Sequence, residues 1–195
     1  TGVASVTDNN GIIDVLGVCG SLRKDSYNRM ALQAAAELKP ETMALDGCEL
    51  AGIPIYDEDV FQKGFPPAVA NFRERIAKAD ALVIATPEYN FSIPGVLKNA
   101  IDWASRPPDQ PLNGKPVAII GVSPGMFGTA RAQIHLRQVC AALNMLVLNK
   151  PDILIPAAAG KFDENGRLTD ETTRKFLADM LVALEQWTRT VRRRD

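Results

Sequence analysis

Polar side chains that can bind an anion gather in one short stretch near the start of the chain. The stretch Gly20–Asn28 reads GSLRKDSYN and holds two serines, an arginine, a lysine and an asparagine. A mostly apolar run, Ile12–Cys19, precedes it, and apolar residues at helical spacing follow it over Met30–Leu38. A helix start offers unpaired backbone N–H groups, while hydroxyls and a guanidinium add hydrogen bonds and charge. We therefore expect a strand, a polar loop and a helix that together bind a phosphate group.

The form of this loop disfavours two common nucleotide-binding motifs. It is neither G-x-x-x-x-G-K-[ST], the P-loop, nor G-x-G-x-x-G, the dinucleotide fingerprint. A serine at a helix start often serves only as a cap, which contributes about 1 kcal/mol and implies no ligand. Phosphate binding is favoured over capping alone because Gly20, Ser21, Arg23, Ser26 and Asn28 all fall within nine residues.

A second polar loop, Thr86–Ile93, follows another predicted strand, Asp80–Ala85. Pro87 and Pro94 bracket it and exclude regular structure, and Pro94 suits the first turn of a helix. Aromatic rings beside polar groups fit a flat ligand with polar edges, although the same rings can also anchor a loop in the core. The side chains concerned are Glu88, Tyr89, Asn90 and Phe91.

A third loop begins at the end of the predicted strand Val117–Val122 and has the pattern Gly121-x-Ser123-Pro124-Gly125-x-x-Gly128. Its glycines let a ligand approach the main chain closely. In the helix that follows, Arg131 is placed to face either the ligand or a partner subunit. His135 is the only histidine of the chain, and we assign it no catalytic role because no cysteine or acid lies at ligand spacing from it.

The elements that position these loops alternate along the chain. Predicted strands cover Ile12–Cys19, Met43–Leu50, Asp80–Ala85 and Val117–Val122, and a fifth is split into Met145–Leu148 and Ile153–Ile155. A predicted helix follows each of them, and Thr169 or Asp170 caps the last. Strict alternation predicts an α/β fold, a doubly wound five-stranded parallel sheet with helices on both faces in three layers. The three loops then share the carboxyl edge of the sheet, where ligands bind.

Two local expectations concern the segment between the second and third strands. Ile53–Asp59 is predicted to be a loop, and its three adjacent carboxylates are expected to be solvated, because no histidine or cysteine that would help to hold a metal stands nearby. The helix that opens at Pro66-Pro67 has apolar residues at helical spacing. Its charged residues are therefore expected to face solvent; they are Arg73, Glu74, Arg75 and Lys78.

Composition limits the classes of partner. The chain has 195 residues, of which 46% are hydrophobic and 23% charged, and its formal net charge is −1. This balance argues against nucleic acid and membrane surfaces as partners, and no apolar run reaches the length of a membrane span. We expect a flexible N-terminal segment, 1–11, and one domain over 12–191. The three cysteines form no Cys-x-x-Cys pair, which indicates reduced thiols in a cytoplasmic protein and no zinc site.

The start of the chain gives two further expectations. The first residues lack the charged-then-apolar layout of a signal peptide. The chain does not begin with Met, so we expect the native N-terminus to be missing or processed.

The combination of loops resembles the NADPH-dependent FMN reductase family, especially its bacterial quinone and chromate reductase members. The likeness is carried by GSLRKDSYNR at 20–29, PEYNFSIPGVLKNAIDW at 87–103 and GVSPGMFG at 121–128, and extends over 12–191. It implies a flavodoxin-like fold, bound FMN, NADPH or NADH as co-substrate, and two-electron transfer to quinones and acceptors such as chromate. It also implies a homodimer or homotetramer.

By position, the resemblance assigns one set of residues to the phosphate end of FMN: Ser21, Leu22, Arg23, Lys24, Ser26, Tyr27 and Asn28. It places Pro87, Glu88, Tyr89 and Asn90 along the flavin ring, with Ser123 and Gly125 on the other side. No side chain receives a catalytic role and no metal is implied, because the flavin carries the chemistry. Asp25 is an unusual acid within the phosphate loop, and we expect it to point outward.

Two other functions stay open. One is an FMN reductase that supplies free reduced flavin to a partner, and the other is a flavodoxin-type electron carrier. The near-neutral net charge of −1 counts against the electron carrier, because flavodoxins are typically strongly acidic. For the enzyme we expect NAD(P)H and the acceptor to use one site in turn, in a ping-pong sequence.

Overall fold

The computed structural model describes residues 11–192 and shows one parallel sheet. Its strands are β1 (Ile13–Cys19), β2 (Met43–Cys48), β3 (Ala81–Ala85), β4 (Pro116–Val122), β5 (Leu146–Val147) and β6 (Ile153–Ile155). The order is β2-β1-β3-β4-β5, and β6 also pairs with β4. The start of β4 pairs with β5 and its end with β6, so these two strands share the fifth position. The predicted five-stranded sheet with a split last strand is confirmed.

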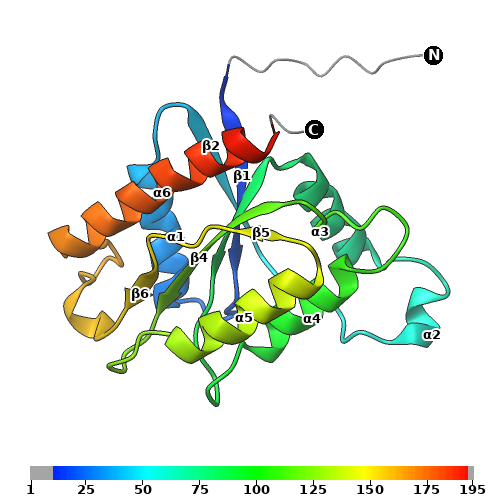
Figure 1. The fold of residues 1–195 in the computed structure, drawn as a ribbon. Helices are drawn as coiled ribbons and strands as arrows, with labels where there is room; N and C mark the ends of the chain where they lie inside the picture. Colours follow the sequence, from blue (N-terminus) through cyan, green and yellow to red (C-terminus); the bar gives the residue numbers. More distant parts are fainter. Residues whose placement is uncertain (1–10, 193–195) are drawn as a thin grey trace.

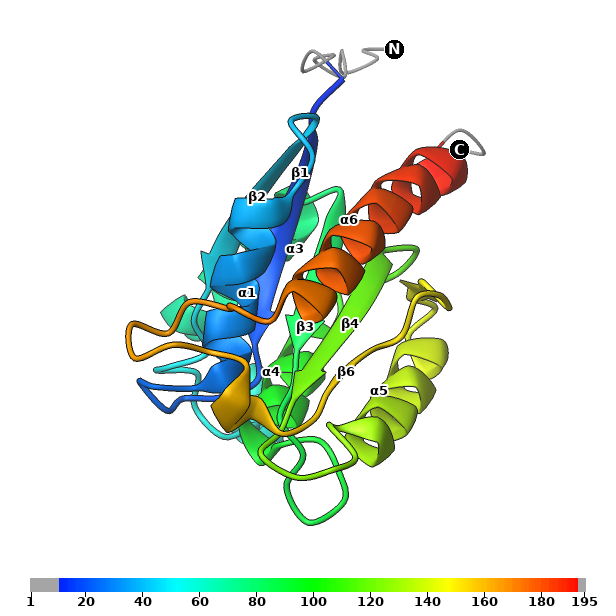
Figure 2. The same cartoon turned by 90° about the vertical axis from the view of Figure 1, so that its left-hand side faces the viewer.

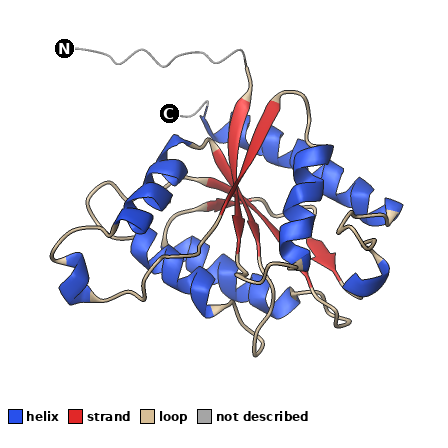
Figure 3. Ribbon diagram, turned by 180° about the vertical axis from the view of Figure 1, so that it is seen from behind, coloured by secondary structure: helices blue, strands red, loops and turns tan. Residues whose placement is uncertain are grey.

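Helices cover both faces of this sheet (Figure 1). On one face lie α1 (Tyr27–Leu38) and α6 (Glu171–Arg192), which Figure 2 shows in front of the strands. The other face carries α3 (Pro67–Lys78), α4 (Gly95–Ala104) and α5 (Ala130–Ala142). Figure 3 shows the strands enclosed between these helical layers. The predicted three-layer arrangement is therefore confirmed, while the predicted segment 1–11 lies outside the described residues apart from Gly11.

The core consists of two apolar layers, one on each face of the sheet. Successive side chains of a strand point to opposite faces, so Val15 packs toward α1 and α6 whereas Leu16 packs toward α3 and α4. Every residue of β3 and β4 is buried, as expected for parallel strands covered on both sides. The central strands are thus rigid supports for the loops that leave their carboxyl ends.

The structure corrects the sequence prediction at one connecting segment. A one-turn helix, α2 (Glu58–Phe61), occupies the end of the segment predicted to be a loop. It forms because the Asp57 carboxylate accepts the backbone N–H of Asp59 at 2.8 Å and caps the turn. A 3-10 turn also covers Ala158–Gly160. The predicted cap of the last helix is confirmed for Asp170, which accepts the N–H of Thr173 at 2.9 Å.

Arg73 is a larger correction, because it was predicted to face solvent and is only 9% exposed. Its guanidinium donates to the carbonyl oxygens of Ala104 at 2.6 Å, Arg106 at 2.7 Å and Pro108 at 2.6 Å. The ring of Phe65 lies 4.1 Å from it. Burial lowers the pKa of the Arg73 guanidinium. The local pattern around Arg73 misses this role because its acceptors come from the end of α4 and the loop beyond it.

Arg73→Met is expected to lower the free energy of unfolding by about 3 kcal/mol, because several buried carbonyl oxygens lose a charged donor. Equilibrium unfolding in urea measures the change. Lys78→Met on the same helix is the control, since the Lys78 side chain is 75% exposed and pairs only with Glu74 at the surface. A loss for Arg73→Met no greater than that for Lys78→Met would contradict the structural role of Arg73.

In the part of the chain that the structure describes, none of the helices has the length and apolar character needed to cross a membrane.

Candidate functional site

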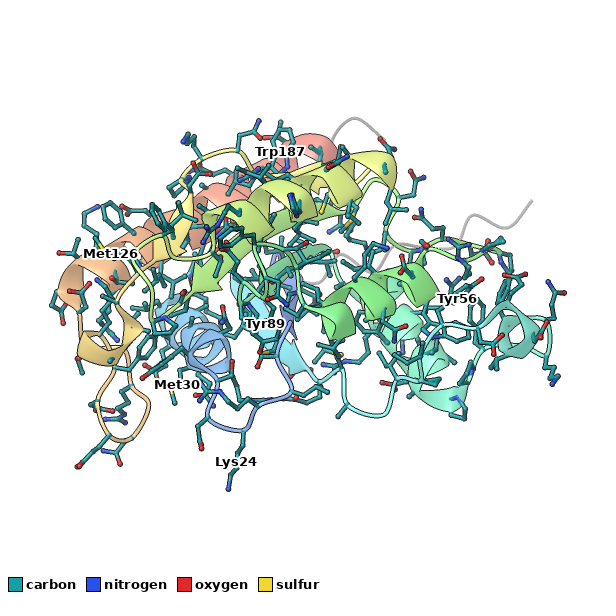
Figure 4. The ribbon with its side chains drawn as sticks, turned by 90° about the horizontal axis from the view of Figure 1, so that it is seen from below. Lys24, Met30, Tyr56, Tyr89, Met126 and Trp187 are labelled. Atoms are coloured by element: carbon teal, nitrogen blue, oxygen red, sulfur yellow. The ribbon has the colours of Figure 1, made fainter. Side chains whose placement is uncertain are left out.

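The loops that follow β1, β3 and β4 meet at the carboxyl edge of the sheet, the edge viewed in Figure 4. They border a cavity of about 410 Å³. This volume lies within the range of cofactor and small-ligand sites. The lining residues are Ser21, Arg23, Ser26, Tyr27, Asn28, Pro87, Glu88, Tyr89, Val122, Ser123 and Pro124.

One end of the cavity is a cradle of hydroxyl and backbone N–H groups at the start of α1. Ser26 is the N-cap residue of α1, yet its side chain makes no capping hydrogen bond. Ser21 and Ser26 are each only 3% exposed, and the Ser21 hydroxyl accepts the N–H of Arg23 at 3.3 Å. The first N–H groups of a helix lack partners within the helix and carry partial positive charge. This end of the cavity therefore suits a phosphate group.

Asn28 connects this cradle to the opposite wall of the cavity. Its amide nitrogen donates to the carbonyl oxygen of Val122 at 3.0 Å, and its amide oxygen accepts the N–H of Val122 at 3.0 Å. The side chain, which is buried, therefore ties the start of α1 to the end of β4. The direct contact with phosphate expected for Asn28 stays a prediction, and the structure adds this second role.

Glu88 holds the loop after β3 against α5. One carboxylate oxygen accepts the backbone N–H groups of Arg131 at 3.0 Å and Ala132 at 3.1 Å. The other oxygen accepts the Nε–H of Arg131 at 2.6 Å. The Glu88 side chain is 7% exposed, so the pair is largely shielded from water on the carboxylate side. Glu88 thus caps the first turn of α5 from a position 43 residues earlier in the chain.

The tip of the same loop is a tight turn at Tyr89–Ser92. Tyr89 and Ser92 exchange two backbone hydrogen bonds of 3.0 Å, and the two residues between them have positive φ, 50° at Asn90 and 65° at Phe91. Asparagine tolerates this left-handed conformation, but for a bulky residue such as phenylalanine it costs about 1–3 kcal/mol. The guanidinium of Arg131 lies 3.6 Å from the centre of the Phe91 ring and helps to hold the turn.

A second cavity of about 300 Å³ adjoins the first and shares Glu88 and Ser123 with it. The side chains around it are unusually exposed for aromatic residues: Phe91 is 63% and Phe127 is 69% exposed. Tyr89, in the wall of the first cavity, is 51% exposed. The rest of the lining consists of Asn90, Gly125, Met126, Gly128 and Arg131. Exposed aromatic side chains are therefore present where the two cavities adjoin.

Most of the predicted site residues line the first cavity. Asn90 and Gly125 line the second cavity instead, and Leu22 and Lys24 line neither of them. Leu22 and Lys24 are exposed, and Figure 4 shows the Lys24 side chain projecting away from the ribbon. Asp25 is exposed, as expected for an acid that points outward.

Four further residues line one of the cavities although no sequence pattern marks them as site residues: Val122, Pro124, Met126 and Phe127. The Ser-Pro-Gly run signalled a special loop, but no spacing rule indicated which neighbours face the ligand. Arg131 faces the second cavity, which was one of the two orientations considered for it. Among residues 11–192, no group of three or more His, Cys, Asp or Glu is arranged to hold a metal ion.

Comparison with known proteins identifies relatives of this chain. The family model of NADPH-dependent FMN reductase matches residues 13–160. NAD(P)H-dependent FMN reductase PA1204 of Pseudomonas aeruginosa is 56% identical over 180 residues, which are 92% of this chain and 97% of that protein. The quinone reductase of Escherichia coli strain K12 is 44% identical over 183 residues, again 92% of this chain and 97% of the relative.

Among solved structures, FerB, a flavoenzyme NAD(P)H:(acceptor) oxidoreductase of Paracoccus denitrificans, matches with a TM-score of 0.84 and 36% identity. The match covers 92% of this chain and 98% of FerB. The cradle at α1 fits the phosphate of FMN, since buried hydroxyls and helix N–H groups converge there. The remainder of the cavity, which has the Tyr89 ring in its wall, fits the flavin ring. This chain therefore belongs to the NADPH-dependent FMN reductase family and has the flavodoxin-like fold, with FMN as its cofactor and NAD(P)H as its co-substrate.

Proposed function

We propose that this protein is a quinone reductase that keeps its FMN bound while NAD(P)H and acceptors bind and are released. The observation that carries the proposal is the joining of two cavities, one with a buried phosphate cradle and one with exposed aromatic walls. The cradle favours retention of FMN, because Ser21 and Ser26 are almost fully shielded from water. The aromatic walls offer stacking surfaces to flat acceptors such as quinones. The quinone reductase of Escherichia coli among the relatives supports the same acceptor class.

The residues around the site bind and orient, while the two-electron chemistry belongs to FMN when it is bound. We assign Ser21, Arg23 and Ser26 to the phosphate, and Tyr89 and Ser123 to the two sides of the ring. Reduction of a quinone to a hydroquinone takes two electrons and two protons. A hydride from NAD(P)H supplies both electrons and one proton. We propose that the second proton comes from water, since Glu88 is the only carboxylate in the two linings and its oxygens are bonded to α5.

The proposed order of substrates rests on a shared binding place beside the flavin. NAD(P)H and the acceptor are proposed to occupy it in turn, in a ping-pong order, because both must reach the same side of the flavin. Chromate is proposed as a second acceptor, because a reduced flavin in an open site can transfer electrons to many oxidants without a specific binding pocket for each.

The test is the visible absorption spectrum of the purified protein, recorded anaerobically before and after NADPH. We expect a flavin spectrum that bleaches with NADPH and returns when a quinone is added in equimolar amount. Parallel lines in a two-substrate kinetic series would support the ping-pong order, and chromate in place of quinone tests the second acceptor. A flavin spectrum that NADPH does not bleach would instead favour an electron carrier.

The relative from Pseudomonas aeruginosa, named an FMN reductase, supports a second candidate function, the supply of free reduced flavin to a partner. The two functions differ in flavin retention. Ultrafiltration of the reduced protein separates them, because a quinone reductase keeps the flavin with the protein whereas a flavin supplier loses it to the filtrate.

We also propose a homodimer or homotetramer, supported by exposed apolar side chains on α5 and beside the second cavity. Examples are Ile134 and Met126, which are 65% and 88% exposed. Light scattering after gel filtration measures the assembly. A cytoplasmic location is proposed from the three free buried cysteines, which suit a reducing compartment.

A further inference from the structure

We infer that His135 is a positioning residue for the flavin site, which it affects through the turn at Tyr89–Ser92. This inference rests on the proposed function, because it takes the cavity beside Tyr89 as the place where FMN binds. The ring Nδ1 of His135 and the Ser92 hydroxyl oxygen lie 2.9 Å apart, and either group can be the donor, depending on the tautomer. His135 is exposed and contributes nothing to the core.

The contact reaches the cavity in two short steps. Ser92 is joined to Tyr89 by both backbone hydrogen bonds of the turn, each 3.0 Å long. Tyr89 in turn lines the cavity directly. A side chain that fixes Ser92 therefore fixes the main chain at Tyr89, and with it one wall of the cavity.

An anchor matters for this turn because its backbone conformation is energetically costly. Asn90 and Phe91 both have positive φ, and neither is a glycine. Arg131 holds Glu88, the residue just before the turn, and also contacts the Phe91 ring within it. His135 lies four residues beyond Arg131, one helical turn along the same face of α5, and holds the second half of the turn. The two side chains together fasten the turn to the helix at both ends.

The experiment compares FMN binding to His135→Ala, Ser92→Ala and the double variant with binding to the wild-type protein. Flavin-free protein is titrated into FMN, and quenching of flavin fluorescence gives the Kd. We expect each single variant to raise the Kd about fivefold, the effect of one hydrogen bond of ordinary strength. The double variant is expected to match the single variants, because all three lose the same contact. His135→Asn, which places an amide near the position of Nδ1, is expected to restore binding to within about twofold of wild type.

Two further measurements separate positioning from a merely structural role. The melting temperature of the flavin-free variants is expected to stay at the wild-type value, because the bond lies on an exposed surface. Gln138→Ala, which removes another exposed α5 side chain, is the matched control and is expected to leave the Kd unchanged. An unchanged Kd for His135→Ala, or single-variant effects that multiply in the double variant, would overturn the inference.

The same series distinguishes this inference from the proposed function. If the wild-type protein fails to reduce quinones but binds FMN with the pattern above, the proposed function fails and the positioning role stands. If the wild-type protein reduces quinones and the His135→Ala Kd is unchanged, only the positioning role fails.

Discussion

Ser26→Asp is expected to raise the Kd for FMN about 100-fold, because it places a negative charge where the phosphate binds, and two charges about 4 Å apart at a protein surface repel by several kcal/mol. The substitution keeps the helix, since aspartate caps a helix start as well as serine does. The Ser26 side chain makes no capping bond in the structure and lines the cavity at the start of α1. The loss is therefore a loss of ligand binding rather than of the fold.

Riboflavin is the internal control for this experiment, because it has the same ring as FMN and lacks the phosphate. We expect the riboflavin Kd of Ser26→Asp to remain close to that of the wild-type protein. Fluorescence titration of flavin-free protein measures both ligands. Ser26→Ala, which removes a hydrogen bond without adding charge, is expected to weaken FMN binding by about tenfold at most. Equal loss of FMN and riboflavin binding would show that the cradle at α1 is not the phosphate site.

Gly121→Ala is expected to lower the free energy of unfolding by about 3 kcal/mol through overpacking. A Cβ at this position of β4 would lie 1.5 Å from the hydroxyl oxygen of Thr129 and 2.8 Å from the amide nitrogen of Gln133. Both neighbours are buried, and Gln133 is also bonded to the carbonyl oxygen of Ile153 at 2.9 Å. They have no space into which to turn, so the start of α5 must move away from the sheet.

That movement is also expected to weaken FMN binding, since the start of α5 holds the Glu88 carboxylate. Urea unfolding and FMN titration on the same samples measure the two effects. Gly95→Ala is the matched control, because a Cβ there meets nothing within 4 Å and Gly95 is the first residue of α4. Its stability should change by less than about 1 kcal/mol, toward greater stability. A Gly121→Ala protein as stable as the Gly95→Ala protein would refute the close packing of α5 on β4.

The sheet was predictable from sequence because its signals are local and repeated. Asp80–Ala85 and Val117–Val122 are uninterrupted apolar runs, and Pro66-Pro67 and Pro94 mark helix starts within a residue or two of those observed. Because strands and helices alternate, the crossover connections are expected to be right-handed and the ligand is expected at the carboxyl edge of the sheet. The loops at that edge were recognisable because glycine, proline and polar residues interrupt the apolar pattern.

The internal connections of the site were not predictable, because they join residues far apart in sequence through single side chains. Nothing near Glu88 indicates that its carboxylate caps a helix 43 residues later. Arg73 has the spacing of an exposed residue, and its burial depends on carbonyl oxygens of another segment. The spacing around His135 indicates no metal or acid partner, and its partner in the structure, a serine hydroxyl in a loop, leaves no such local signal.

The bond between Asn28 and Val122 has a consequence for hydrogen exchange. The N–H of Val122 is held by a side chain from the start of α1, 94 residues earlier in the chain. Exchange of this one amide with deuterium therefore requires the cradle to separate from β4, while most amides of β4 report on opening of the sheet. The Val122 amide is thus a built-in reporter of how often the cradle comes apart, and its protection with and without FMN measures how much the cofactor closes it.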